Sequence, residues 1–167
     1  MRILKSERLI LRPLTFNELL HINNNDISKF GTYIETEAML NFVKTAISKK
    51  ITKMQNVDEK VHPWCTYWLI IDSNNGKGVG FIGFKGFPDE NGYSEVGYSI
   101  STNYRKKRLT TEALETLLKW ADECDECRGI TAKTLKTNTG SNKVLQNCNF
   151  QLSESSEKEN YYVIKFK

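Results

Sequence analysis

The part of the sequence that most clearly suggests chemistry is a short basic turn, Arg-Lys-Lys-Arg at residues 105–108. It follows residues 93–100, where apolar side chains alternate with polar or small ones as in a strand. It precedes residues 109–121, where apolar side chains recur every three or four positions as in a helix, and where Thr110 and Thr111 offer N-cap hydroxyls. The start of a helix presents backbone N–H groups and a positive dipole end. Beside four cationic side chains, these groups predict a binding site for an anion, most naturally a phosphate.

A second group with chemical potential is the cysteine pair Cys124-x-x-Cys127, a spacing found in zinc and redox sites. A zinc site would need a second pair of ligands, but Cys65 and Cys148 are single residues. The two histidines of the chain show no ligand spacing either. We therefore expect no bound metal and reduced structural or surface thiols.

A sheet and several helices must position these residues. Strand patterns occur at residues 3–14, 64–71, 78–87, 93–100, 129–135 and 161–166, and helix patterns at 15–20, 36–51, 109–121 and from about 141. Residues 52–63 are polar and are expected to form a loop. Turn signals between the strands 64–71, 78–87 and 93–100 predict that these three are antiparallel. The helix that follows permits residues 129–135 to form a parallel neighbour.

Length and composition favour one ordinary domain spanning residues 1–167. The chain is 39% hydrophobic and 26% charged, which is typical of a globular protein. Its net charge of +4 does not by itself indicate nucleic acid or membrane as a partner, although it suits an anionic cofactor. Neither a signal peptide nor an apolar run of membrane-spanning length is visible, so we expect a cytoplasmic protein.

The region around the basic turn resembles the GNAT superfamily of acyl-CoA N-acyltransferases, in particular the branch that acts on ribosomal-protein N-termini. That branch commonly shows E-[IV]-G-Y-x-[IL]-x-x-x-[YF]-R-G-K-G-[YL]-A-T-E-A. The matching residues are Glu95, Val96, Gly97, Tyr98, Ile100, Tyr104, Arg105, Lys107, Leu109, Thr111, Glu112 and Ala113. Lys106 and Arg108 replace the two loop glycines, which allow positive φ and close approach to phosphates, and Thr110 replaces an alanine. Either Arg108 compensates through its charge, or coenzyme binding is weakened.

A second motif supports the same resemblance. The family pattern N-x-x-S-x-x-V-L-x-x-x-G-F is matched at Asn138, Ser141, Val144, Leu145 and Phe150. Asn149 stands at the glycine position, where asparagine tolerates the left-handed conformation that ends helices.

The resemblance implies an α/β (α+β) fold: a mixed, mostly antiparallel sheet of about six to seven strands, flanked by helices on both faces. It also implies transfer of an acetyl group from acetyl-CoA to a primary amine, either a protein N-terminus or a small molecule, by direct attack in a ternary complex. No nucleic acid, membrane or metal is implied as a partner, and both a monomer and a homodimer are compatible with it. Phe30 and Tyr33 would wall the acceptor site. The coenzyme would be held by Tyr98, Ser99, Ile100, Arg105, Lys106, Lys107, Arg108, Leu109, Thr110, Thr111 and Asn138.

Two residues are candidates for the proton transfers of such a reaction. Glu95 could remove a proton from the ammonium group, whose reference pKa is about 8 to 10.4, or it could be a strand carboxylate paired with a neighbouring cation. Ser141 could donate a proton to the departing sulfur, or it could cap a helix. A degenerate protein that binds coenzyme A or another anion without catalysis is the alternative function, motivated by the missing glycines. A nucleic-acid contact at the basic turn is a third and weaker interpretation.

Overall fold

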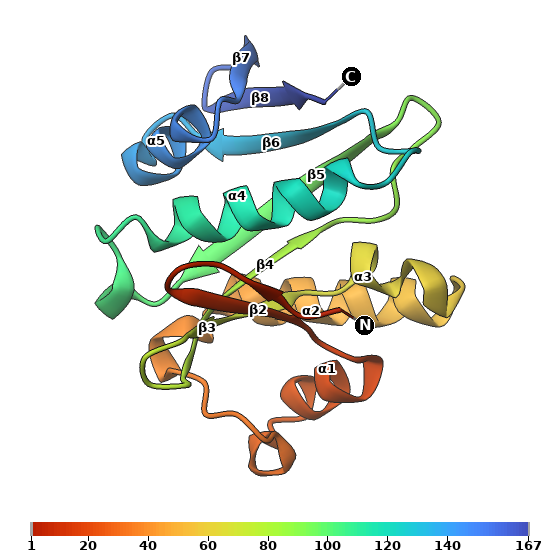
Figure 1. Ribbon diagram of the computed structural model, residues 1–167, viewed down its shortest axis with the longest axis vertical. Coiled ribbons are helices and arrows are strands. Elements are labelled where there is room, and N and C mark those ends of the chain that lie inside the picture. Colours follow the sequence, from red (N-terminus) through yellow and green to blue (C-terminus); the bar gives the residue numbers. More distant parts are fainter. Residues whose placement is uncertain (1, 167) are drawn as a thin grey trace.

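The structure is built on one eight-stranded sheet. The computed structural model describes residues 2–166, in which the strands are β1 (Leu4–Lys5), β2 (Leu9–Pro13), β3 (Trp68–Asp72), β4 (Gly78–Phe84), β5 (Tyr93–Ile100), β6 (Gly129–Leu135), β7 (Gln151–Ser155) and β8 (Glu159–Lys165). Their order across the sheet is β1-β2-β3-β4-β5-β6-β8-β7 (Figure 1). All neighbouring pairs are antiparallel except β5 and β6, which are parallel.

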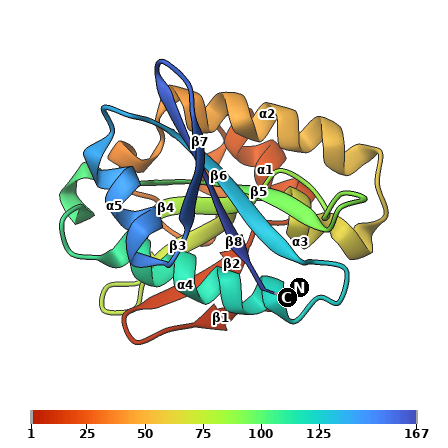
Figure 2. The same ribbon diagram turned by 90° about the horizontal axis from the view of Figure 1, so that it is seen from above.

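Helices cover both faces of this sheet. The helices are α1 (Phe16–Asn23), α2 (Asn41–Gln55), α3 (His62–Cys65), α4 (Leu109–Asp122) and α5 (Thr139–Asn147), with single 3₁₀ turns at Ile27–Lys29, Thr36–Ala38, Glu59–Val61 and Thr102–Tyr104. Seen from above, α1 and α2 lie on one side of the central strands and α4 lies on the other (Figure 2). No helix within residues 2–166 combines the length and apolar character needed to cross a membrane.

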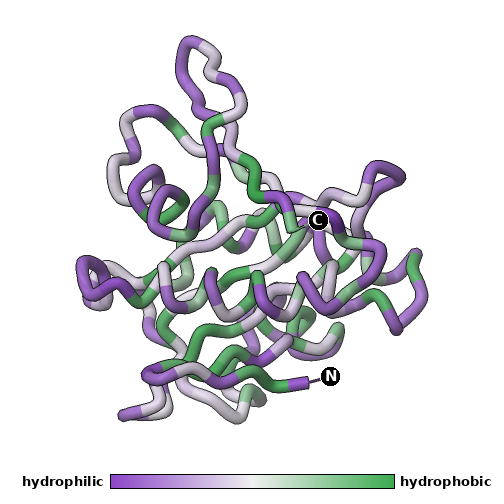
Figure 3. Tube along the Cα trace, turned by 45° about the horizontal axis from the view of Figure 1, so that its top comes forward, coloured by the Kyte–Doolittle hydropathy of each residue, from purple (hydrophilic) through white to green (hydrophobic). Residues whose placement is uncertain are grey.

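Two hydrophobic clusters, one on each face, hold the layers together. One contains the inward face of α4 with Val96 and Ile100 of β5. The other contains the inward faces of α1 and α2 with Phe81 of β4. Figure 3 shows hydrophobic residues concentrated along the central strands, while hydrophilic residues dominate the hairpin tips and loops. Because side chains alternate along β5, its even-numbered residues face α4 and its odd-numbered residues face α2.

Several local features follow directly from the sequence. Thr15 caps α1 in a capping box, in which its side chain accepts from the Glu18 N–H and the Glu18 side chain accepts from the Thr15 N–H. Asn25 and Asn149 adopt the left-handed conformation, with φ of 58° and 68°. The interpretation of Asn149 as an acceptable substitute for glycine is therefore confirmed.

The structure corrects some expected boundaries. The sheet has eight strands instead of six or seven, because residues 3–14 form a hairpin of two strands and the short edge strand β7 had no recognisable pattern. Trp64 and Cys65 lie in α3 and not in a strand. Pro63 is the second residue of this helix, in the first turn, where proline is tolerated. The second helix spans Asn41–Gln55, so it reaches into the polar segment expected to be a loop.

Candidate active site

The central feature of the site is the place where β5 and β6 stop pairing. The two strands are in register only from Tyr93↔Gly129 to Glu95↔Thr131. On its other edge β5 stays paired with β4 as far as Ile100. The Lys85 N–H donates to the Glu95 carbonyl and the Ser101 N–H donates to the Val79 carbonyl, so odd-numbered residues direct their backbone groups at β4. The backbone groups of Val96, Tyr98 and Ile100 therefore face the side of β6 beyond the end of the ladder.

This geometry separates the three strand residues expected at the coenzyme. The backbone groups of Tyr98 and Ile100 point to the β6 side, as contact with an extended ligand requires. Ser99 lies opposite Phe81 in the β4–β5 ladder, so its backbone groups point the other way. A ligand strand lying along this edge of β5 would thus meet Tyr98 and Ile100 but would not reach the Ser99 backbone.

The basic turn connects β5 to α4 and has an unusual backbone. Lys106 and Arg108 both adopt the left-handed conformation, with φ of 63° and 61°. These are the two positions at which the family pattern has glycine, so the turn keeps the glycine conformation although both residues carry long side chains. A left-handed residue with a Cβ atom costs roughly 1–2 kcal/mol. All four basic side chains of the turn are exposed to solvent.

The start of α4 differs from the expected capping. Arg108 is the N-cap, and its side chain makes no capping hydrogen bond within residues 2–166. Thr110 and Thr111 lie inside the first helical turn, so the expectation that their hydroxyls cap the helix is wrong. The first N–H groups of α4, from Leu109 onwards, have no partner within the helix by geometry. They are available to an anion together with the positive end of the helix dipole.

A network from the N-terminal hairpin fixes this turn. Glu112 accepts hydrogen bonds from the Ser6 hydroxyl at 2.5 Å, the Arg8 N–H at 2.8 Å and Arg8 Nε at 2.8 Å. Arg8 Nη1 in turn donates to the Lys107 carbonyl at 3.0 Å. Burial would raise the pKa of Glu112, but the hydrogen bonds and the charge of Arg8 outweigh it, so the pKa of this carboxyl is lowered. The motif identified Glu112, but no sequence signal indicated Ser6 and Arg8 as its partners.

A pair of hydroxyl groups bridges β5 and α5. The Tyr98 hydroxyl lies 2.9 Å from the Ser141 hydroxyl. Burial raises the pKa of Tyr98 to about 12, so the phenol stays protonated at neutral pH. The N-cap of α5 is Asn138, whose Oδ1 accepts from the Ser141 N–H at 3.1 Å. The interpretation of Ser141 as the N-cap is therefore wrong, and its hydroxyl is directed at Tyr98.

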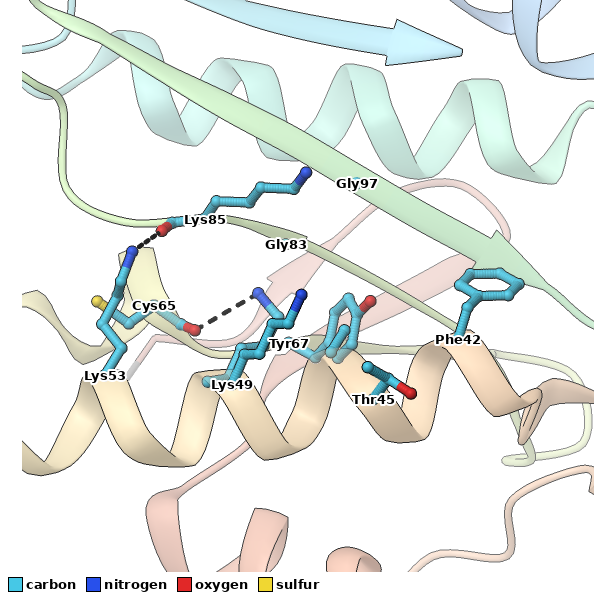
Figure 4. A pocket seen from close by; sticks show the side chains of 11 residues that line it. Phe42, Thr45, Lys49, Lys53, Cys65, Tyr67, Gly83, Lys85 and Gly97 are labelled. Atoms are coloured by element: carbon cyan, nitrogen blue, oxygen red, sulfur yellow. Dashed lines mark hydrogen bonds between the residues drawn. The ribbon is translucent and has the colours of Figure 1, made fainter. Parts of the chain in front are cut away.

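Glu95 lies on the opposite face of β5, beside a cavity. Its carboxylate accepts from Lys85 Nζ at 2.5 Å, and about a third of its side chain is exposed. The cavity has a volume of about 480 Å³ and lies between α2 and the paired strands β4 and β5 (Figure 4). Gly83 and Gly97 form its floor, since they are directly opposite each other in the ladder and carry no side chains. A Cβ atom at Gly97 would meet no atom within 4 Å.

Four lysines line this cavity, and none of them was predicted from the sequence as a site residue. They are Lys49, Lys50 and Lys53 of α2 and Lys85 after β4. Lys50 is almost completely buried, and its Nζ donates to the carbonyls of Phe84 at 2.9 Å and Cys65 at 3.4 Å. Burial lowers the pKa of Lys50 to about 7. The spacing of the three lysines on α2 was a usable signal, but lysine on a helix is most often solvent-exposed.

The remaining candidate residues lie elsewhere. Phe30 is buried in the cluster between α1 and α2, with the Arg12 guanidinium over its ring. Tyr33 is 59% exposed, and neither residue lines the cavity, so their role at an acceptor site stays a prediction. Cys127 is buried in the core and Cys124 packs against it. Within residues 2–166 no three potential metal ligands come together.

Comparison with known proteins identifies the family. The sequence model of the acetyltransferase (GNAT) domain matches residues 8–151. An uncharacterized N-acetyltransferase, YjdG of Bacillus subtilis, is 34% identical over 96 residues, a match that spans 58% of this chain and 57% of YjdG. The ribosomal-protein-S5-alanine acetyltransferase of Vibrio fischeri has a similar fold, with a TM-score of 0.72, 14% identity and 100% and 98% of the two chains covered.

A third similar protein is the ribosomal-protein α-N-acetyltransferase RimL, solved in complex with coenzyme A. Its TM-score is 0.68, with 16% identity and 98% of each chain covered. These two structural likenesses concern the fold, whereas the family match covers most of the sequence. The chain belongs to the GNAT acetyltransferase family.

Proposed function

We propose that this acetyltransferase transfers the acetyl group of acetyl-CoA to a primary amine, by direct attack of the amine within a ternary complex. The observation that carries the proposal is the unpaired edge of β5, which begins beyond Glu95 and leads to the start of α4. One end of this edge suits an anion, and the other adjoins the cavity beside Glu95. A donor and an acceptor can therefore meet at the middle of β5.

The donor half of the site has two parts. The N–H groups at the start of α4, with Arg105 and Lys107 beside them, suit the pyrophosphate of the coenzyme. The backbone groups of Tyr98 and Ile100 suit the amide groups of its pantetheine arm, which would add to the sheet as a strand does. The coenzyme A complex of RimL supports this arrangement, because the two proteins share the fold.

The protein groups supply proton transfer and charge stabilisation, while acetyl-CoA supplies the acetyl group and a thiol leaving group. Glu95 is the candidate base for the ammonium, directly or through water. It precedes Gly97 by two residues on β5, so its side chain is on the same face of the sheet as the cavity. A backbone N–H of β5 that faces the opening can donate to the thioester oxygen as negative charge develops on it. Ser141, held by the protonated Tyr98, can return a proton to the departing sulfur.

Thiol release from acetyl-CoA in the presence of a panel of primary amines tests the proposal, with product mass as a second readout. We expect release that depends on the amine and a product heavier by one acetyl group. Glu95→Gln should lower turnover more than it weakens coenzyme binding, and unchanged turnover would show that the Glu95–Lys85 pair is structural. Binding of coenzyme A without acetylation of any amine would instead favour a degenerate, non-catalytic protein.

A further inference from the structure

The cavity on the α2 face has a chemical character that the acetyl donor does not explain. Four ammonium-bearing side chains line it, and no acidic side chain is among the described residues that do so. Lys53 donates to the Lys85 carbonyl, and the lining residue Lys85 donates to Glu95, which is on the same face of β5 as Gly97. The net charge of the whole chain is only +4, so this is a local concentration of positive charge. The local field therefore favours anions.

This charge belongs to a different place from the phosphate turn. Lys85 is paired with Glu95 near the beginning of β5, whereas α4 starts beyond the end of β5. Glu95 and Ile100 are five residues apart, which is roughly 17 Å of strand. The cavity also opens on the α2 face, while α4 covers the other face (Figures 2 and 4). The lysines are thus poorly placed to hold the pyrophosphate at the start of α4.

The rest of the lining fits a small organic molecule. Phe42, Ala46 and Tyr67 supply apolar and aromatic surface, and the two glycines leave the floor open (Figure 4). A volume of about 480 Å³ lies within the range of small-molecule sites. The candidate base Glu95 adjoins the floor through Gly97.

We infer that the acceptor is a small primary amine that carries an anionic group, a carboxylate or a phosphate, which the cavity lysines bind while its amino group faces Glu95. The inference rests on the proposed function, because it assigns the acceptor for that reaction. Lys50 adds a second consequence. Its ammonium is destabilised by burial and by the nearby charges of Lys53 and Lys85, and only Cys65 acts in the opposite direction. An anion bound beside it would favour the protonated form, so binding should take up a proton.

Matched pairs of amines test the inference. O-phosphoethanolamine with ethanolamine, and β-alanine with β-alaninamide, each share an amino group and differ in whether an anionic group is present. We expect kcat/KM to be at least tenfold higher for the anionic member of one pair, and the pair with the larger ratio identifies phosphate or carboxylate. Equal values within both pairs, from an enzyme that does acetylate amines, would overturn the inference and leave the proposed function intact.

Variants connect the preference to the cavity. The double variant Lys49→Gln/Lys53→Gln removes two exposed charges and should reduce the anionic-over-neutral ratio by about tenfold. Lys44→Gln, which removes a charge from the same helix outside the cavity, should leave the ratio unchanged. Gly97→Val should abolish binding of either anionic amine, because its side chain enters the open floor without a positive φ to strain it. A double variant that loses coenzyme A affinity instead would overturn the inference, since the lysines would then serve the donor.

Binding measurements separate failure of the inference from failure of the proposed function. Calorimetry of O-phosphoethanolamine and β-alanine without acetyl-CoA, in buffers of different ionisation enthalpy, should show binding at pH 7 with uptake of up to about half a proton. If no amine is acetylated but this binding occurs and is lost in the double variant, the anion site stands and the proposed function fails. If neither anionic amine binds, the inference fails whatever the turnover shows.

Discussion

The left-handed turn before α4 gives a prediction whose size can be worked out. Lys106 and Arg108 hold φ near 60° at positions where glycine would be unstrained. Replacing either residue by glycine removes a backbone strain of roughly 1–2 kcal/mol from the folded state. The same change lowers stability by roughly 0.4–1 kcal/mol, because glycine gives the unfolded chain more conformational freedom. The net gain is about 0.5–1 kcal/mol for each of Lys106→Gly and Arg108→Gly. For a domain of this size the double variant should melt about 3–6 °C higher.

Thermal unfolding followed by circular dichroism, without coenzyme, measures this gain. Lys107→Gly is the matched control, because it introduces glycine into the same turn at a residue without positive φ. It should lower stability by about 0.5–1 kcal/mol. If Arg108→Gly destabilises the protein as much as Lys107→Gly does, the strain argument is refuted. Coenzyme affinity should stay within about threefold for Arg108→Gly, and a much larger loss would identify Arg108 as a phosphate ligand.

Three further predictions concern single side chains. Glu112→Gln should lower the free energy of unfolding by about 1–2 kcal/mol at pH 7, as measured by denaturant titration. Because the pKa of Glu112 is lowered in the folded state, this difference should be present above pH ~4.3 and vanish as the pH falls through the lowered pKa. A difference that does not change with pH would contradict the prediction. Ser141→Ala should reduce turnover by about tenfold while coenzyme affinity is kept, and Tyr98→Phe should act in the same direction, so an unchanged turnover in both excludes the hydroxyl pair from proton transfer. The pKa of Lys50 is lowered to about 7 in the folded protein, so above pH 7 the unfolded chain binds one more proton at this residue than the folded chain does. The free energy of unfolding of the wild type should therefore rise relative to that of Lys50→Met between pH 7 and 10, by at most about 1.4 kcal/mol per pH unit.

Much of the fold could be predicted from local patterns. The alternation along β5 and the helical spacing of α4 are encoded in neighbouring residues, and the structure confirms them. The second family motif also indicated that Asn149 could adopt the left-handed conformation, and the structure confirms it. The short edge strand β7 could not be predicted in this way. It is exposed along its whole length, so its sequence lacks the alternation of apolar and polar residues that marks a half-buried strand.

The site was harder to predict where it depends on contacts between distant segments. The carboxylate of Glu95 was expected to be either a base or half of an ion pair, and the structure supplies Lys85 as the partner without excluding the first role. The burial of Lys50 depends on α2 packing against β4, which no local pattern records. The Tyr98–Ser141 contact joins β5 to α5, and only the fold brings these two motif residues together.

The Arg8–Glu112 link has a consequence for the order in which the molecule assembles. It joins residues 104 positions apart, and through the Lys107 carbonyl it also fastens the loop on which the donor would rest. A nascent chain therefore cannot finish that loop until the first hairpin and the fourth helix have both emerged and met. Removing or occluding the first eight residues should thus weaken donor binding, although these residues include the edge strand β1, three strands away from β4. A purification tag is therefore better placed at the other terminus.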